Sequence, residues 1–461
     1  MRAATLIALS THRGYQHTAF AFNGVILLRG LGDWAVLSEM RVAYAAGSRS
    51  NFACGVGAKS PILGAGALVL MLLSASAVQA QCTAVGPLAS SPSTPTVAMA
   101  VAGVSASAGA LVSSIYSANT AFLNQSNAFI GSPDEPQPDQ PGGGVWARGV
   151  GGHLSSSTTA TAGNISFGGH LPGNISCNTR TLEDFAGVQL GADIARLNVN
   201  GWNLHAGSTI GYLGSKTQDA TPATPGLNPA PSFRDSLQIP FVGVYGAASY
   251  GGFLVDGQVR GNFFQNEVSD DNHGLSGQQF DARGISLTGN VAYNQKLSNH
   301  WFVEPSAGIV WSRTRVDPLN VPAIGIVGTP FAPGFFPPWV FTVNDIESTL
   351  GRLSVRVGTT VTSGSVIWQS FASASVIHEF QGGATSSLLG NSAAMGSSLQ
   401  NLSSTVSTSS FDTFGQFGVG VAAKVVNTGW VGYLRGDYRR GEYIEGWSVN
   451  GGLRYQFVSG I

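Results

Sequence analysis

From residue 145 to residue 457 the sequence repeats one pattern, in which apolar and polar side chains alternate over segments of roughly ten residues. Such alternation has the period of a β-strand whose two faces meet different surroundings. Val255 and Val259, for example, fall on one face of their segment, whereas Asp256 and Arg260 fall on the other. The pattern therefore predicts an all-β fold made of two-faced strands.

Twelve segments follow this pattern, and long and short connections alternate between them. The segments are 145–152, 184–194, 202–212, 239–249, 252–264, 283–295, 300–311, 349–361, 366–379, 413–425, 429–439 and 446–457. The short connections carry turn residues, such as Asn200-Gly201 and Gly364. A soluble sandwich has no reason to place all its long loops at one end. An outer-membrane barrel does, because its periplasmic turns are brief and its outer loops are long.

The composition excludes several other classes of protein. Charged residues make up 10% of the chain, against roughly 25% in an ordinary soluble domain, which is too few to coat a large water-soluble globule. Hydrophobic residues reach 43%, which argues against disorder, and a helical membrane bundle would need several apolar runs of roughly 18 residues. The net charge of −1 argues against a nucleic-acid partner.

The N-terminal part reads as a targeting region. The apolar run 61–78 follows Arg49 and Lys59 and ends in Val78-Gln79-Ala80, a small-x-Ala cleavage pattern. We therefore expect an N-terminal extension and secretory signal over 1–80, with cleavage near Ala80. A single membrane anchor is the less favoured reading.

Three short regions are expected between the signal and the strands. Residues 81–96 form a short mature tail. Residues 97–130 are rich in Ala and Ser and carry no charge or Pro, which favours a helix inside a polar enclosure over an unstructured stalk. Residues 131–144 read GSPDEPQPDQPGGG, the composition of a linker. The barrel is expected over 145–457, followed by an extension at 458–461.

The polar face of the strands carries charges of both signs, as expected for a hydrated or ion-paired lumen, and the apolar face is expected to contact lipid. The candidate lumen residues are Asp256, Arg260, Glu304, Arg352, Arg356, Arg435, Asp437, Arg439 and Arg454. We favour an ion-paired network around the plug over a path for a passing polypeptide or solutes. Tryptophans such as Trp202, Trp301 and Trp430 fall near strand ends, where interfacial belts lie.

Motifs for catalysis or cofactor binding are not found in the sequence. Gly-x-Ser-x-Gly, a phosphate loop and paired metal-ligand spacing are all missing. His378 and Glu379 are adjacent in a strand and point to opposite faces, so they form no dyad. The compact cluster 270–273 is at most a weak cation site. We expect no enzyme activity, no cofactor and no metal.

Three stretches resemble the autotransporter β-domain, the translocator of type V secretion. They are VWARGVGG after the linker, ASVIHEF, and the terminal run WVGYLRGDYRRGEYIEGWSVNGGLRYQF. The resemblance covers Gly144 to Phe457. It implies a 12-stranded antiparallel transmembrane β-barrel with an N-terminal α-helix inside or near the pore. It also implies insertion by the barrel-assembly machinery, an assembly signal at Tyr455 and Phe457, and export of a passenger.

The sequence departs from the family pattern in three places. The short tail leaves no room for a sizeable passenger, four residues follow Phe457, and the helix lacks the Asn-Asn pair at which self-cleaving members are cut. The topology adds one hypothesis. If the helix runs inward from the cell surface, Cys82 and Cys177 both lie outside, where they are either disulfide-bonded or two free thiols.

The sequence thus predicts a translocator β-domain in the bacterial outer membrane, with little or no passenger. Its expected partners are outer-membrane lipid and the barrel-assembly machinery, with no nucleic acid. Two alternatives remain at this stage. One is a pore or channel, and the other is an adhesin-like surface protein that binds host or surface ligands through loops 153–183, 312–348 and 381–412.

Overall fold

The computed structural model divides the chain into two compact units, Met1–Ser74 and Ala75–Ile461. The described residues are 18–22, 25–29, 34–38, 82–86, 94–121, 136–166, 173–221, 232–270, 275–298, 300–321, 324–325, 335–336, 339–390, 403–409 and 411–458. In the first unit, β1 (Thr18–Phe22), β2 (Val25–Arg29) and β3 (Trp34–Ser38) form an antiparallel sheet. The predicted signal segment, 61–80, lies outside the described residues.

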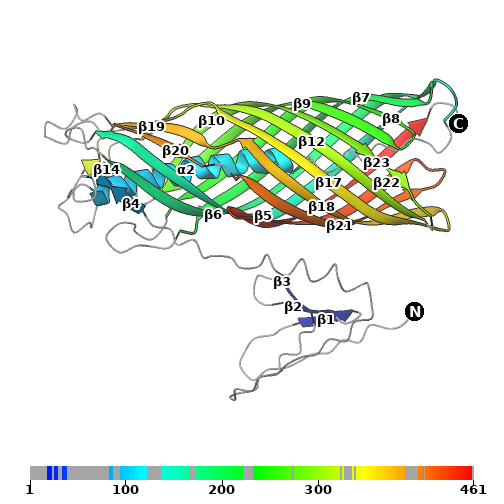
Figure 1. Ribbon diagram of the computed structural model, residues 1–461, viewed down its shortest axis with the longest axis horizontal. Helices are drawn as coiled ribbons and strands as arrows, with labels where there is room; N and C mark the ends of the chain where they lie inside the picture. The colour runs from blue at the N-terminus through cyan, green and yellow to red at the C-terminus, as the bar shows by residue number, and fades with distance from the viewer. Residues whose placement is uncertain are drawn as a thin grey trace, which may run out of the picture. The chain divides into compact units, whose positions relative to one another are not determined.

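The second unit is a closed antiparallel barrel whose main wall is made of twelve long strands (Figure 1). These strands are β5 (Gln140–Ser166), β6 (Asn174–Val199), β7 (Trp202–Asp219), β8 (Arg234–Tyr250), β9 (Phe253–Asp270), β10 (Leu275–Tyr293), β12 (Trp301–Val316), β17 (Ile346–Ser363), β18 (Val366–Gln381), β21 (Thr413–Val425), β22 (Trp430–Gly441) and β23 (Ile444–Val458). The last strand, β23, pairs with the first, β5, which closes the ring. The predicted fold class is confirmed.

Most of the strands are longer than the alternating pattern predicts, and most of the additional length lies at the end with the long loops. The clearest case is β5, which continues to Ser166. The sequence pattern missed this part of the strand because Ser and Thr occupy both of its faces and leave no apolar stripe. Shorter strands extend the wall at this outer end. They are β4 (Cys82–Val85), β13 (Leu319–Val321), β16 (Trp339–Val343), β19 (Ala384–Gly390) and β20 (Ser403–Thr408).

Three further pairs of residues form very short strands. β11 (Gln295–Lys296) pairs with β12 near a tight turn, and β14 (Ile324–Gly325) pairs with β15 (Phe335–Phe336) in a separate two-stranded sheet.

The two faces of the wall have opposite chemistry, as predicted. Leu353, Val419 and Leu453 point outward and are 68%, 66% and 60% exposed. Arg352 and Arg454, each adjacent to one of these residues, are buried inside the barrel. A soluble protein would bury the apolar face instead, so this sidedness fits a wall surrounded by lipid.

Aromatic side chains gather at the end with the tight turns. Trp202 lies against Tyr250, and Trp430 lies against Tyr455, with ring centroids 5.1 Å apart in both pairs. Trp301 is also exposed there. Such rings match the aromatic belt at a membrane interface.

The expected linker, 131–144, is wrong at its C-terminal end, because Gln140–Gly144 belong to β5 and pair with β6. Glycine is required in this stretch. A side chain at Gly143 would meet the backbone of Asp193, and one at Gly144 would meet the guanidinium of Arg454. Pro and Gly thus begin a strand here rather than a flexible segment. The expected tail, 81–96, likewise contains β4 and the start of a helix.

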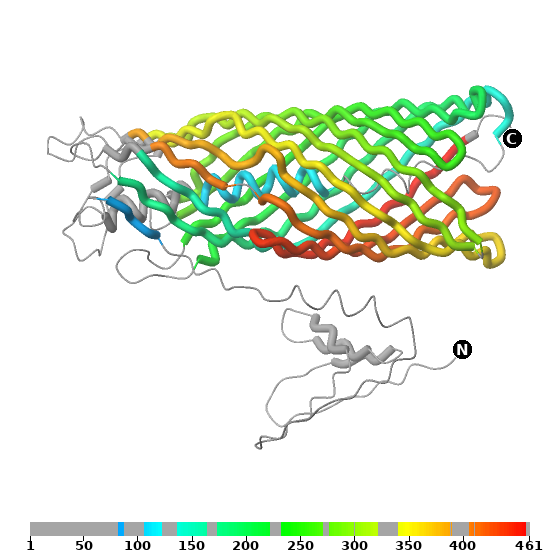
Figure 2. Tube along the Cα trace, in the orientation of Figure 1, coloured from blue at the N-terminus to red at the C-terminus, as the bar shows by residue number. Residues whose placement is uncertain are grey.

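The helix α2 (Thr94–Thr120) lies inside the barrel, entering from the end with the long loops (Figures 1 and 2). Pro95 stands in the first turn, where a helix needs no N–H donor. Residues 122–130 of the range expected for the helix lie outside the described residues. Among the helices that the structure describes, none has the length and hydropathy to cross a membrane.

Candidate functional site

The candidate site is the contact between α2 and the inner wall of the barrel. Ala106, Ala108 and Ala110 are fully buried, and Gly109 faces Thr158 so closely that a side chain there would meet its hydroxyl. Small residues let a helix fit inside a narrow barrel without displacing the wall. The Ala- and Ser-rich composition that predicts the helix is therefore also what allows it to enter.

A carboxylate on β6 accepts hydrogen bonds from the buried face of α2. Ser113 donates to Glu183 at 2.6 Å, Ser117 donates at 3.1 Å, and Ser114 donates at 3.4 Å. Ser114 also lies 3.2 Å from the hydroxyl of Ser215 on β7. A buried carboxylate needs such partners, because burying an unsatisfied charge is costly. Glu183 thus holds two successive turns of the helix to one wall.

Two arginines hold the C-terminal end of α2. Arg260 on β9 donates to the Ala118 carbonyl at 2.7 Å, and Arg439 on β22 donates to the Thr120 hydroxyl at 3.1 Å. Around the ring of twelve main strands, β9 and β22 lie six positions apart, on opposite walls. The C-terminus of a helix carries partial negative charge. The two cations therefore hold this end from both sides.

Aromatic and polar contacts complete the hold on the helix. Tyr116 packs edge-on against Phe411 and Phe414, with ring centroids 5.1 Å and 5.6 Å away. The guanidinium of Arg439 stands 5.7 Å above the same tyrosine ring. Asn119 donates to Ser312 on β12 at 2.8 Å. Strands from around the whole ring thus contact the last turns of α2.

The remaining predicted lumen residues face inward and make ion pairs or hydrogen bonds with one another. Arg356 pairs with Glu304 at 2.7 Å, and Arg435 pairs with Asp437 at 2.6 Å. Asn290 bridges two others, donating to Asp256 at 3.0 Å and accepting from Arg352 at 3.3 Å. This arrangement is the network that the mixed charges suggest.

Arg454 joins the last strand to the second strand of the barrel. It makes two hydrogen bonds to Asp193, at 2.7 Å and 2.8 Å, across the space left open by Gly144. His205 and Tyr245 also contact this carboxylate, at 3.0 Å and 2.7 Å. Four strands, β6, β7, β8 and β23, thus meet at one buried acid.

The sequence reasoning missed Asp193 and Glu183. Asp193 lies in the predicted segment 184–194 but its pairing depends on the barrel's register, and Glu183 lies one residue before that segment. The spacing of Ser113 and Ser117, one helical turn apart, is the signal that a hydrogen-bonding stripe on α2 faces a buried acceptor.

The other predicted site residues are placed as follows. Tyr455 and Phe457 point outward near the end of β23, where they are 39% and 44% exposed. Cys82 on β4 and Cys177 on β6 form a disulfide. Glu379 is buried and accepts from Ser348.

His378 lies on the other face of the same strand, 2.7 Å from Thr413, so it does not act together with Glu379. Of the cluster 270–273, Asp270 accepts a hydrogen bond from Ser232, and 271–273 lie outside the described residues. Within the described part of the chain no group of three acidic, His or Cys residues is arranged to hold a metal.

Comparison with known proteins agrees with this architecture. Residues 145–329 match the family model of the autotransporter β-domain. The transport unit of the autotransporter AIDA-I from Escherichia coli has a TM-score of 0.51 and 18% sequence identity, covering 76% of this chain and 99% of that one. The β-domain of the Bordetella autotransporter BrkA has a TM-score of 0.45 and 20% identity, covering 68% and 98%.

One curated relative also matches. It is the uncharacterized protein YuaQ of Escherichia coli strain K12, which is 25% identical over 147 residues. The match covers 29% of this chain and spans only 10% of that relative's length.

Proposed function

We propose that the barrel of this chain is an autotransporter β-domain of the outer membrane, which carries the segment N-terminal to α2 to the cell surface and then closes around α2. The observation that supports this proposal is the path of the chain through the lumen. β4 lies at the outer end of β6, whereas Gln140 at the start of β5 pairs with Leu197 near the tight turns.

The direction of that path follows from the loops. Tight turns of outer-membrane barrels face the periplasm. The N-terminal end of α2 therefore lies on the outer side and its C-terminal end points inward. A chain acquires this path when its N-terminal part has passed outward through or alongside the barrel while the barrel itself stays in the membrane.

In this proposal α2 plugs the lumen of the barrel once export is complete. Residues 106–121 are buried nearly throughout, and contacts to Glu183, Arg260 and Arg439 hold the helix from several walls. An open channel would leave these inner-wall groups facing water. The channel and adhesin alternatives are therefore not favoured.

The finer parts of the proposal concern partners and processing. Lipid contacts the outward apolar band. Tyr455 and Phe457 present an aromatic end to the barrel-assembly machinery, and the secretory signal is removed near Ala80. The inward ion pairs, such as Arg454 with Asp193, stabilise the wall and do no chemistry, and the chain has no enzyme activity.

An epitope placed between Gln81 and Cys82 tests the proposed direction. Antibody added to intact cells is expected to bind this epitope. The matched control is the same epitope in the tight turn at Gly364-Ser365, which is expected to bind antibody only after the outer membrane is permeabilised. The opposite pattern would overturn the proposed orientation and, with it, the export function.

A further inference from the structure

A disulfide connects the short strand β4 to the barrel wall. Cys82 and Cys177 are bonded, with their Cα atoms 4.1 Å apart, and they face each other in the register of β4 and β6. β4 pairs with β6 over four positions only, from Cys82 to Val85. Such a short strand is marginal by itself. The covalent bond therefore adds a hold on this part of the chain that does not depend on strand pairing.

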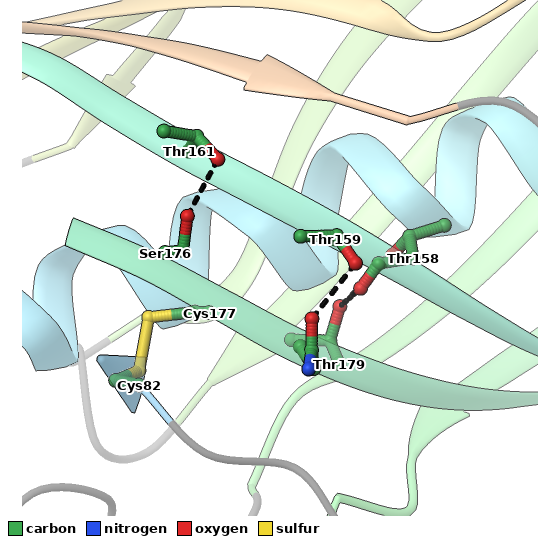
Figure 3. The surroundings of a disulfide bond; sticks show 8 residues. Cys82, Thr158, Thr159, Thr161, Ser176, Cys177 and Thr179 are labelled. Atoms are coloured by element: carbon green, nitrogen blue, oxygen red, sulfur yellow. Dashed lines mark hydrogen bonds between the residues drawn. A yellow bond between two sulfur atoms is a disulfide. The ribbon is translucent and has the colours of Figure 1, made fainter. Parts of the chain in front are cut away.

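The bond is sheltered from solvent. Cys82 is 8% exposed and Cys177 is 1% exposed. Figure 3 shows the bond next to hydroxyl pairs that join β5 to β6, including Thr161 with Ser176 at 2.7 Å and Thr158 with Thr179 at 2.9 Å. Thiol–disulfide exchange requires access of a thiolate to a sulfur atom. The folded wall thus protects the bond from external reductants.

The disulfide closes a ring that contains α2. The chain runs from Cys82 through β4 and α2, returns along β5, and reaches Cys177 on β6, a separation of 95 residues. Within that ring a single cut separates no part of the molecule from the rest. A cut between β4 and α2 leaves the helix joined to β5, and it leaves β4 joined to β6 through the sulfur atoms.

We propose that the Cys82–Cys177 bond is a covalent anchor, which keeps β4, at the N-terminal end of the exported chain, on the barrel at the cell surface even when the chain is cut between β4 and β5. The anchor rests on the proposed function, because that function places this segment outside. Its formation is balanced by thiol–disulfide exchange. One thiolate attacks the disulfide of a periplasmic thiol oxidoreductase, the second thiolate displaces it, and the oxidoreductase leaves with two reduced thiols.

The test uses the full chain with an epitope between Gln81 and Cys82 and a protease site inserted in the segment 87–93. After cutting on cells, the epitope is expected to remain with the cells. On a non-reducing gel it is expected to migrate with the barrel, and on a reducing gel with a short fragment. Release of the epitope from the protein with both cysteines would overturn the anchor.

Two cysteine variants provide the comparison. With Cys82→Ser/Cys177→Ser, and equally with Cys82→Ser alone, cutting is expected to cause complete loss of the epitope from the cells. Equal retention by these variants would show that β4 holds without the bond, which contradicts the proposal. Heat-modifiable migration of each variant verifies that the barrel has folded, and Cys82→Ser leaves the wall residue Cys177 in place.

The failure of this inference is distinguishable from failure of the proposed function. If antibody does not reach the epitope on intact cells, the proposed orientation is wrong. The protease cut is then made in detergent extracts. The gel still reports whether the bond holds the fragment. If the epitope is accessible but leaves after cutting, the anchor fails and the export function stands.

Discussion

Replacing Ser113 and Ser117 with alanine removes the two shortest hydrogen bonds that Glu183 accepts from α2, at 2.6 Å and 3.1 Å. The carboxylate stays buried, and Ser114 remains as a donor at 3.4 Å. In the docked state the variant therefore carries an under-satisfied buried acid. When α2 leaves the lumen, water hydrates that acid, so the substitution shifts the balance toward the undocked state.

The size of the shift follows from the lost bonds. Leaving a buried acceptor without one donor costs about 1–3 kcal/mol, so two donors amount to about 2–6 kcal/mol. Since about 1.4 kcal/mol is tenfold in an equilibrium constant, the undocked fraction should rise by about 30-fold to about 10⁴-fold. The larger increases in the undocked fraction apply when Glu183 is ionised, because a buried charge costs more to leave without donors than a neutral group does.

Conductance in planar bilayers measures this fraction, because in the proposed function α2 blocks the lumen and ions cross when the helix leaves it. We expect rare openings for the unaltered protein and frequent or sustained openings for Ser113→Ala/Ser117→Ala. Adding Glu183→Leu to the double variant removes the unsatisfied acid and should restore mostly closed behaviour, since replacing both partners by apolar groups is nearly neutral. Heat-modifiable migration shows that all three proteins have folded barrels.

Two results would refute this reasoning. Either the double variant stays as closed as the unaltered protein, or the triple variant is as open as the double. The first result means that Glu183 does not hold the helix. The second means that the serines act through contacts other than this carboxylate.

Three further predictions concern the wall itself. Asp193→Asn leaves the Arg454 guanidinium buried without its carboxylate, which should destabilise the barrel by about 3–5 kcal/mol and lower the temperature at which it unfolds on heat-modifiability gels. Gly144→Val places a side chain against the same guanidinium and should lower that temperature as well. The hydrogen bond from Arg313 lowers the pKa of Asp345, in the connection before β17. Because this folded-state pKa is depressed, the contact stabilises the outer rim at pH values above the ordinary aspartate pKa, and this stabilisation is lost as the pH falls through the depressed pKa. Arg313→Gln should return the pKa of Asp345 toward its ordinary range, and NMR titration measures this change.

Matched variants separate these effects from general disturbance. Glu347→Gln removes an exposed partner of Arg313 and should change stability by no more than about 0.5 kcal/mol. Gly436→Ala adds a methyl group where no atom lies within 4 Å, so it should leave the unfolding temperature unchanged. If Gly436→Ala and Gly144→Val change the unfolding temperature equally, the close fit of Gly144 against Arg454 has no energetic role.

Much of the barrel could be predicted from the sequence because strand alternation is local. Val355 and Arg356 fall on opposite faces whatever the rest of the chain does, so sidedness and strand count follow from the pattern. The outer strand ends could not be found this way. Thr158 and Thr181, for instance, are polar residues on the inner face, and alternation of apolar with polar residues stops where both faces are polar.

The partners of the inward residues could not be predicted either, because they depend on how the strands are offset around the ring. Arg454 and Asp193 are 261 positions apart and meet across an intervening strand. Only the closed barrel determines which inward residues lie at the same height along the barrel axis. For Cys82 and Cys177 the sequence predicted a shared side of the membrane, given an inward-running helix, but it left a disulfide and two free thiols both open.

The contacts of Arg260 and Arg439 also fix the direction in which α2 occupies the lumen. Neither arginine has a carboxylate partner among the described residues, so the partial negative charge of the helix C-terminus serves as their counter-charge. A helix inserted the other way would present its positive N-terminus to both guanidinium groups. The same two residues that favour the observed direction therefore disfavour the reverse one.

This argument predicts that the two arginines act together. Arg260→Gln or Arg439→Gln keeps a donor but removes the charge, and each should weaken docking by about 0.3–2 kcal/mol, seen as more frequent openings in planar bilayers. The double variant should open more often than either single one. Arg356→Gln, which loses its pairing with Glu304 instead, should lower barrel stability without increasing the openings. Equal openings in Arg356→Gln and the double variant would show that general loosening of the wall, and not the charge at the helix end, sets how tightly α2 is held.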